Sequence, residues 1–338
     1  MRRPHITILN SSTFGKHFSE HLETLEAFAD IRHLTVPADI DGDALAAQLK
    51  DTDGIIASVT PKIPRQTLEQ CPNLVLLVRH GIGCDNVDLS AATELGIIVS
   101  RVKGIVEKEA VAEYAVALLV AGSRQLPQGS RAVRGSAWSA RSGMVGMEIK
   151  GKTVGIIGLG NIGSRSAEIL SRGFGARVVA SDPYIAKERF AAYGAEEVAL
   201  DELIRTSNAI LFHCPLTNET KRMLGAAEFA NMQPGAVLVN TCRGELVDED
   251  ALYAALQNGP LGAYATDVVE GEPIDGNHRL AKLDNVLITP HLGGYSWESL
   301  HGMGQTCVDD SVAVFQQGGI PGEIANPEVL KKTYRKWQ

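Results

Sequence analysis

Within this chain of 338 residues, an apolar run leads directly into a cluster of glycines: Val154-Gly155-Ile156-Ile157-Gly158-Leu159-Gly160-Asn161-Ile162-Gly163. The apolar first half of this stretch is typical of a buried strand, and its second half places three glycines in a GxGxxG pattern. Where such a strand leads into a helix, backbone amides and the helix dipole can hold a pyrophosphate group. The same glycines would also suit a tight turn from strand to helix that binds nothing.

A carboxylate lies at the distance that dinucleotide binding requires. Asp182 ends the next predicted strand, 19 residues after Gly163, where its oxygens can accept hydrogen bonds from the adenosine ribose. A negative charge there would repel the 2′-phosphate of NADP, and no arginine follows it directly. Lys187 is the nearest positive charge and argues in the other direction. The glycines and Asp182 together predict NAD as the cofactor.

Short apolar runs alternate with helical stretches on both sides of this motif. The spacing implies parallel strands joined by right-handed crossovers, and therefore two doubly wound parallel sheets of the α/β class. The strands expected in the first sheet are 5–10, 31–36, 54–59, 74–79 and 97–102. Those expected in the second are 153–157, 177–181, 209–214, 236–241, 263–267 and 286–289.

The second sheet is expected to be an insertion within the first domain. A helix over 107–121 starts with acidic residues and becomes apolar towards its end, which suits burial between domains or at an interface. The final helix, 297–317, is typical of a segment that packs back on the first domain. We therefore expect a flavodoxin-like substrate domain of residues 1–103 and 297–338, and an inserted Rossmann domain of residues 104–296 that binds NAD and carries a dimerisation arm.

Composition excludes several classes of protein. The 32 Lys and Arg against 40 Asp and Glu give a net charge of −8, so no basic field attracts nucleic acid. No apolar run approaches the ~18 residues that span a bilayer, and no secretory leader is visible, so we expect a cytoplasmic protein. Cys71, Cys84, Cys214, Cys242 and Cys307 show no metal-ligand spacing, which predicts reduced thiols and no structural metal.

Three polar side chains follow predicted strands, at the edge where open α/β sheets bind ligands. Arg243 follows strand 236–241 and could hold a carboxylate through two parallel hydrogen bonds, although a surface arginine would fit there too. His291 could exchange a proton near neutral pH, and Glu272 could fix its tautomer. Each also has an ordinary alternative, His291 as a loop histidine and Glu272 as a solvated acid before a proline.

The ordered segments resemble the D-isomer-specific 2-hydroxyacid dehydrogenase family, which includes phosphoglycerate, glycerate and D-lactate dehydrogenases. The segments that carry the resemblance are GLGNIG at 158–163, HCPLTNET at 213–220, NTCRGELVDED at 240–250, TDVVEGEP at 266–273 and TPHLGGYS at 289–296. RHGIGCDNVDLSAATELGIIV at 79–99 and KEAVAEYAVALL at 108–119 extend it towards the start of the chain. Several ordered motifs are far more specific than any one of them.

The resemblance implies a role for each matching residue. Arg243 matches the substrate-binding arginine, Glu272 its acid partner and His291 the general acid and base. The loop that holds the substrate carboxylate is expected at Arg79, His80, Gly81 and Ile82. The residues that match cofactor contacts are Gly158, Gly160, Asn161, Ile162, Gly163, Asp182, Cys214, Pro215, Thr241, Cys242, Asp267 and Gly294. Cys214 and Cys242 would then line the site as thiols and not act as nucleophiles.

The activity implied is NAD-dependent hydride transfer between a D-2-hydroxy acid and its 2-oxo acid, as in a 3-phosphoglycerate dehydrogenase or a hydroxypyruvate or glyoxylate reductase. A phosphorylated substrate is favoured if three cations, Arg79, Arg101 and Lys103, form one binding site for an anion. It is not favoured if these side chains are solvated or lie in a dimer contact. Oxidation of an unusual substrate such as phosphite, and an NAD-sensing corepressor on the same fold, are the alternatives.

The resemblance also favours a homodimer. The segments expected at the contact are the helix 110–121 and the loop 129–147, which holds Trp138, Met144 and Met147. Burial of these apolar side chains inside a single chain is the alternative.

Overall fold

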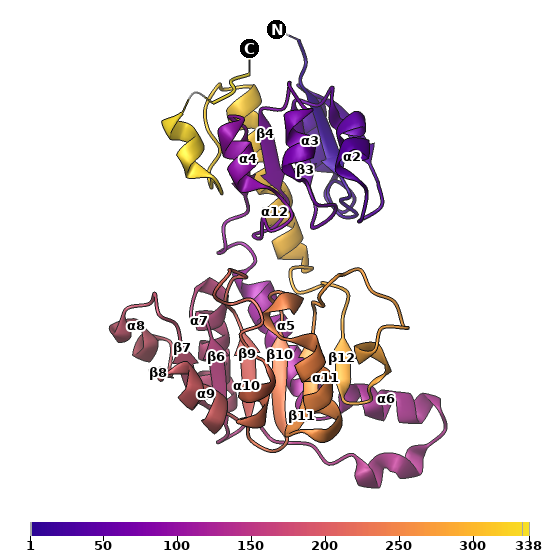
Figure 1. Cartoon of the computed structure of the whole chain (residues 1–338), viewed down its shortest axis with the longest axis vertical. Helices are drawn as coiled ribbons and strands as arrows, with labels where there is room; N and C mark the ends of the chain where they lie inside the picture. The colour runs from indigo at the N-terminus through magenta and orange to yellow at the C-terminus, as the bar shows by residue number, and fades with distance from the viewer. Residues whose placement is uncertain (1, 333, 338) are drawn as a thin grey trace. The chain divides into compact units, whose positions relative to one another are not determined.

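The computed structural model describes residues 2–332 and 334–337, which form two compact units (Figure 1). Unit 1 consists of Met1–Glu107 and Ser296–Gln338, and unit 2 of Lys108–Tyr295. The chain therefore passes between the units twice, where the sequence analysis expects crossings near residues 103 and 297.

Unit 1 is built on a five-stranded parallel sheet in the order β2-β1-β3-β4-β5. Its strands are β1 (His5–Leu9), β2 (Asp30–Leu34), β3 (Gly54–Ala57), β4 (Leu76–Arg79) and β5 (Ile98–Arg101). Its helices are α1 (Ser19–Glu26), α2 (Gly42–Leu49), α3 (Arg65–Glu69), α4 (Leu89–Glu94), α12 (Trp297–Phe315) and the 3₁₀ helix η5 (Pro327–Lys331). This strand order is the flavodoxin-like one, which confirms the predicted fold class for this unit.

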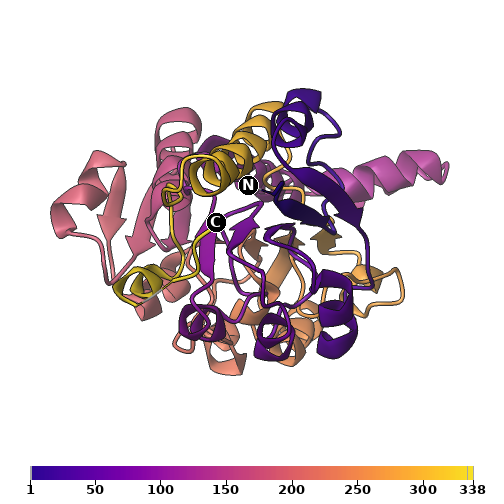
Figure 2. The same cartoon turned by 90° about the horizontal axis from the view of Figure 1, so that it is seen from above.

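Helices cover both faces of the unit 1 sheet. Successive strand residues point to opposite faces, so Ile55 of β3 packs in the core with α2, α3 and α4, whereas Ile56 packs in the core with α1 and α12. Figure 2 shows α1 and α12 along one side of this sheet and the other three helices along the opposite side. Burial on both faces explains why these strands are continuous apolar runs in the sequence.

Unit 2 is built on a seven-stranded parallel sheet in the order β12-β11-β10-β9-β6-β7-β8. Its strands are β6 (Thr153–Ile157), β7 (Arg177–Ser181), β8 (Ala195–Glu197), β9 (Ala209–Phe212), β10 (Ala236–Asn240), β11 (Leu261–Thr266) and β12 (Val286–Ile288). Counted from β6, the strands run in the Rossmann order with a seventh strand added, which confirms the fold predicted for this unit. The sequence analysis missed β8, because this edge strand is short and ends in two exposed glutamates.

The helices of unit 2 also lie on both faces of its sheet (Figure 1). They are α5 (Lys108–Ser123), α6 (Leu126–Arg134), α7 (Asn161–Glu168), α8 (Lys187–Ala192), α9 (Leu200–Thr206), α10 (Ala226–Ala230) and α11 (Glu249–Asn258). Short helical segments are η1 (Trp138–Gly143), η2 (Ile169–Gly173), η3 (Gly244–Leu246) and η4 (Leu280–Lys282). Within the residues that the structure describes, no helix is both long and apolar enough to cross a membrane.

The apolar helix α5 belongs to the core of unit 2. It packs against β10, β11 and α7, and its buried side chains include Val116 and Leu119. Most of the apolar face of α5 is therefore covered within the chain, which is the alternative that the sequence left open for this helix. The segment that follows is different, because none of the residues of α6 and η1 is buried.

Candidate active site

The predicted site residues of unit 2 follow the carboxyl ends of its strands. Because the sheet is parallel, these ends meet at one edge. Gly158 follows β6, Asp182 follows β7, Cys214 and Pro215 follow β9, Thr241 to Arg243 follow β10, Asp267 follows β11 and His291 follows β12. The topology thus explains how motifs scattered over more than a hundred residues come to one edge of one sheet.

His291 and Glu272 form the contact expected from the sequence. Nδ1 of His291 lies 2.7 Å from Oε1 of Glu272, and about a third of each side chain is exposed. A carboxylate can only accept, so Nδ1 of His291 carries the hydrogen of this bond. Nε2 is then the ring atom left to give or take a proton.

Asp267 holds the loop that carries His291. Its Oδ1 accepts hydrogen bonds from Thr289 Oγ1 (2.6 Å) and from the N–H of Leu292 (2.8 Å), and its Oδ2 accepts one from the N–H of Gly293 (2.7 Å). The N–H of His291 donates to the backbone carbonyl of Asp267, and His291 has a φ of 57°. These bonds keep the loop in a left-handed conformation that a residue other than glycine seldom adopts.

The turn that carries Arg243 is held by a residue that the sequence analysis missed. Asn240 is fully buried at the end of β10; its Nδ2 donates to the carbonyl of Arg243 (2.7 Å), and its Oδ1 accepts from the N–H of Cys242 (2.9 Å). Nη1 of the half-buried Arg243 donates to the carbonyl of Cys242 (2.6 Å). The sequence signal that could have revealed these hydrogen bonds is an asparagine at the end of an apolar strand.

Gly244 allows the turn of Arg243 to lie against the loop that carries Glu272. A Cβ placed on Gly244 would lie 2.1 Å from the backbone nitrogen of Glu270 and 2.2 Å from the carbonyl carbon of Val269. Any other residue would push the two loops apart. The predicted acid partner and the predicted substrate arginine are therefore held together by direct backbone packing.

The glycine-rich turn between β6 and α7 is closely packed. Gly158 has a φ of 93°, and a Cβ on Gly163 would lie 2.0 Å from the carbonyl oxygen of Gly158. Gly160, by contrast, is exposed, with no atom within 4 Å of the position of a Cβ. Gly158 and Gly163 thus serve the turn, whereas Gly160 leaves open space where the backbone can approach a ligand. Asn161 and the half-buried Ile162 form the first turn of α7.

Asp182 is fixed by backbone donors at the end of β7. Oδ2 accepts a hydrogen bond from the N–H of Leu159 in the glycine-rich turn (2.8 Å), and Oδ1 accepts one from the N–H of Tyr184 (2.9 Å). The side chain is half-buried, and each carboxylate oxygen can accept a further bond. Lys187 is the positive charge that would favour NADP. Its Nζ lies 3.7 Å from Oε2 of Glu197, and the two form an ion pair.

The two site cysteines are protonated thiols. Burial raises the pKa of Cys214 to about 11 and raises that of Cys242 further. Sγ of Cys242 donates to the carbonyl of Phe212 (3.1 Å), and Sγ of Cys214 lies 3.9 Å from Sδ of Met223. Both thiols therefore pack in the wall, where a nucleophilic thiolate would not form. Pro215, Thr241 and Gly294 are the remaining predicted contacts, and each lies in a loop that follows a strand.

His213 is a second residue of the site that was not predicted from the sequence. Both ring nitrogens are buried without a hydrogen-bond partner, and burial lowers the pKa of the ring to about 3. Its Cβ would lie 3.2 Å from a Cβ on Gly163, so the ring belongs to the surroundings of the glycine-rich turn. A neutral histidine here can donate one hydrogen bond and accept another.

The predicted substrate loop lies in unit 1 and begins at Arg79, the last residue of β4. Arg79 is buried (3% exposed), and its Nη1 donates to the carbonyl oxygens of Ala57 (3.2 Å) and His80 (2.8 Å). Burial, with Arg79 alongside, lowers the pKa of His80 to about 3. The N–H of Gly81 donates to the carbonyl of Arg79, and Ile82 is half-buried. Arg79 therefore supports this loop from within.

The other two cations that the sequence analysis grouped with Arg79 lie near acids. Nη2 of Arg101 lies 3.4 Å from Oε1 of Glu323, and the two form an ion pair. Lys103 is exposed, and its charge interacts with the buried carboxylate of Asp310. The expected cluster of three cations therefore consists of one buried guanidinium and two side chains with neighbouring carboxylates.

Comparison with known proteins identifies the family to which this chain belongs. A family model described as "D-isomer specific 2-hydroxyacid dehydrogenase, NAD binding domain" matches residues 116–293. The chain belongs to this family. It is an NAD-dependent oxidoreductase, and the predicted family, fold class and cofactor are confirmed.

Relatives of this 2-hydroxyacid dehydrogenase differ in length and name. A glyoxylate reductase from Aeropyrum pernix is 35% identical over 337 residues, which cover 98% of each chain. A D-3-phosphoglycerate dehydrogenase from Archaeoglobus fulgidus is 36% identical over 279 residues, which are 82% of this chain but 52% of the relative. The apo structure of D-lactate dehydrogenase from Escherichia coli matches 95% of this chain and 99% of its own with a TM-score of 0.81 and 29% identity.

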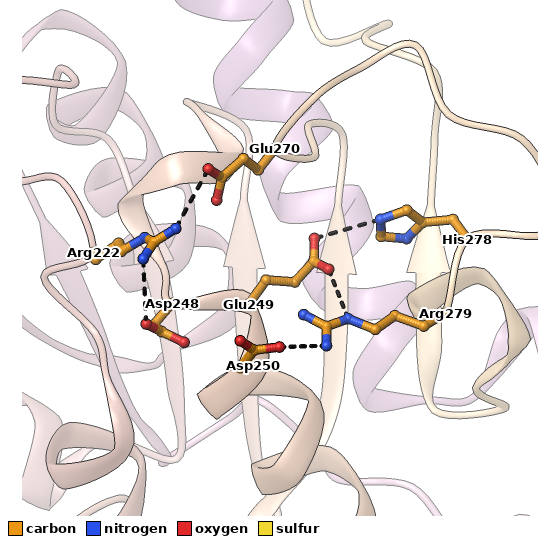
Figure 3. Close-up of a pocket in the computed structure, with 7 residues that line it drawn as sticks. All are labelled: Arg222, Asp248, Glu249, Asp250, Glu270, His278 and Arg279. Carbon is orange, nitrogen blue, oxygen red and sulfur yellow. Dashed lines mark hydrogen bonds and ion pairs between the residues drawn. The ribbon is translucent and has the colours of Figure 1, made fainter.

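A hollow of about 220 Å³ also lies in the NAD-binding unit of the dehydrogenase, beside the start of α11. Figure 3 shows Arg222 between Asp248 and Glu270, and Arg279 with His278 around Glu249 and Asp250. None of these seven residues was predicted to be in the site. Their ion pairs tie the stretch from Glu270 to Arg279, which includes Glu272, to the first turn of α11.

Replacing Asp182 tests the fit of NAD to the dehydrogenase. Asp182→Ala should weaken NADH binding about tenfold to a hundredfold, because one or two hydrogen bonds to a charged group are lost. NADPH binding should weaken less or improve. Titration calorimetry with both dinucleotides checks this, with the exposed acid substitution Asp201→Ala on α9 as the control. Equal loss for both dinucleotides would contradict the ribose assignment.

Proposed function

We propose that this dehydrogenase reduces a small, unphosphorylated 2-oxo acid, of the glyoxylate or hydroxypyruvate type, to the D-2-hydroxy acid with NADH. The observation that carries the proposal is the 2.7 Å contact between His291 and Glu272 beside the turn of Arg243. A cytoplasmic location, as the sequence predicts, is part of this proposal.

The residues divide the chemistry as follows. NADH, when bound, supplies the hydride that reduces the carbonyl carbon of the 2-oxo acid. His291, protonated on both nitrogens, gives its Nε2 proton to the carbonyl oxygen, so that hydride and proton together complete the hydroxyl group. Glu272 stabilises the imidazolium before transfer and keeps Nδ1 protonated after it. In the opposite direction, His291 takes the hydroxyl proton.

Arg243 is assigned to the substrate carboxylate. A guanidinium can bind a carboxylate through two parallel bonds and fix the orientation of the carbonyl group. The loop of residues 79–82 is proposed as a second support, through its backbone and not through the side chain of Arg79. Asp182, Gly160, Asn161 and Ile162 are assigned to the dinucleotide.

The engaged cations favour an unphosphorylated substrate. A phosphate would need cationic donors, whereas Arg79 is buried on carbonyl oxygens and Arg101 is paired with Glu323. The glyoxylate reductase from Aeropyrum pernix is 35% identical to this chain over 98% of both chains. The engaged cations and this similarity support a small neutral-tailed acid over 3-phosphoglycerate.

A substrate panel tests the proposal. Oxidation of NADH should be fastest with glyoxylate or hydroxypyruvate and slower with phosphohydroxypyruvate. His291→Ala should lower turnover about 10² to 10⁴-fold while NADH still binds, because only proton transfer is removed. Initial rates and NADH affinity are measured side by side, and His33→Ala, an exposed histidine of β2, is the control.

Three results would contradict the proposal. Preference for phosphohydroxypyruvate would overturn the substrate class, and unchanged turnover of His291→Ala would overturn the proton-transfer role. If the protein binds NADH but reduces no substrate of the panel, its function would instead be the oxidation of an unusual donor such as phosphite, or that of an NAD-sensing corepressor.

We also propose that the exposed arm, residues 126–147, is covered by a second copy of the chain. Figure 1 shows α6 and the segment after it standing away from the body of unit 2. Four large apolar side chains lie in this short stretch: Leu126 (56% exposed), Val133 (58%), Trp138 (66%) and Val145 (80%). Such a concentration of exposed apolar groups is typical of an interface between subunits.

The mass of the protein in solution tests the dimer. Sedimentation or light scattering should give twice 36.2 kDa for the wild type. Val133→Asp combined with Trp138→Asp should give the monomer, because each charge would have to be desolvated in the contact. Ile320→Asp, a substitution at an exposed apolar residue of unit 1, should leave the dimer intact. A wild-type monomer, or a dimer in the arm variant, would contradict the proposal.

A further inference from the structure

Two helices of unit 1 bring three potential metal ligands together. Glu20 and His21 lie on α1, His301 lies on α12, and the two helices pack against each other (Figure 2). One ligand atom from each residue lies within 4.8 Å of the others, and Nε2 of His301 is 3.8 Å from Oε1 of Glu20. Ligands so far apart in the sequence have no recognisable spacing, which is why the sequence analysis expected no metal.

The central histidine has unsatisfied hydrogen-bonding capacity. His21 is 2% exposed, and its Nε2 is buried without a hydrogen-bond partner. A buried polar atom without a partner costs stability, so its presence points to a partner that binds there. The ring is fixed by Phe14 and Phe18 and by Gly304, where a Cβ would lie 2.3 Å from Nδ1. The helix α12 thus makes room for an imidazole at this point.

The other two ligands can adjust and are open to solvent. The side chains of Glu20 and His301 are 56% and 48% exposed. Bound to a cation at ligand distances of ~2.0–2.2 Å, the three atoms would need to approach one another by about an ångström, which exposed side chains achieve by rotation. Two imidazoles and a carboxylate, with a water in the fourth position, are a set that Zn²⁺ accepts and that Co²⁺ and Ni²⁺ also bind.

We propose that Glu20, His21 and His301 bind one divalent transition cation, of the Zn²⁺ class, that fastens α12 to α1. The helix α12 starts directly after the second crossing between the units, at Ser296. A cation here would stabilise the first half of α12 in unit 1. This proposal does not depend on the substrate or the catalytic residues of the dehydrogenase.

Titration of the full chain with Zn²⁺ tests the site. After removal of metal by a chelator, calorimetry should show one Zn²⁺ per chain, and Zn²⁺ should raise the midpoint of thermal unfolding. His301→Ala and Glu20→Gln, both at exposed positions, should weaken binding at least about tenfold and remove most of that rise. His33→Ala, at an exposed histidine outside the cluster, should bind as the wild type does.

Co²⁺ provides a second readout, independent of stability. Its visible absorption should show nitrogen and oxygen ligands in the wild type, and the spectrum should be lost in His301→Ala. Equal Zn²⁺ affinity in the wild type and both variants would place the cation elsewhere and overturn the proposal. Absence of saturable binding in the wild type would overturn it as well.

Discussion

The buried carboxylate of Asp267 is the interaction on which the site of unit 2 depends. Burial raises its pKa above the usual range, while the hydrogen bonds from Thr289, Leu292 and Gly293 act in the opposite direction and reduce that rise. Its backbone also links three strands, because its N–H donates to the carbonyl of Asn240 and its carbonyl accepts from the N–H of His291. One residue thus joins the ends of β10, β11 and β12, and its side chain helps to fix the loop that carries His291.

Hydrogen bonds from backbone N–H groups to side-chain oxygens recur along this edge of the sheet. Asn240, Asp182 and Asp267 each follow or end a strand. Side-chain oxygens of each accept backbone N–H groups, either of the loop that follows the same strand or of the loop that follows the neighbouring strand. Such bonds satisfy amides that would otherwise lack partners where a strand stops. They also set the direction in which the loop leaves the sheet, and so they position Arg243, the glycine-rich turn and His291. Asp182 and Asp267, assigned from the sequence as cofactor contacts, therefore also organise the loops around them.

Much of this architecture was predictable from sequence because strong local patterns carried it. The strands over 153–157 and 177–181 match β6 and β7 residue for residue, since apolar runs there are bounded by glycines and charges. The short polar strand β8 and the exposed helix α6 have no such pattern and were missed. Arg79 illustrates a different limit. A charged residue at the end of a strand suggests a ligand contact in the sequence, whether its side chain faces solvent or is buried against carbonyl oxygens. Likewise, only the fold could bring His21 next to His301, because these residues lie 280 positions apart in the sequence.

The central claim is that Glu272 supports the protonated form of His291 during reduction. We would compare the turnover of glyoxylate reduction at one fixed pH in the wild type, in Glu272→Gln and in the control Glu202→Gln, at an exposed acid of α9. A neutral amide cannot stabilise an imidazolium, so Glu272→Gln should lower turnover while NADH affinity is kept, and Glu202→Gln should keep the wild-type turnover. Wild-type turnover in Glu272→Gln would contradict the role given to this carboxylate.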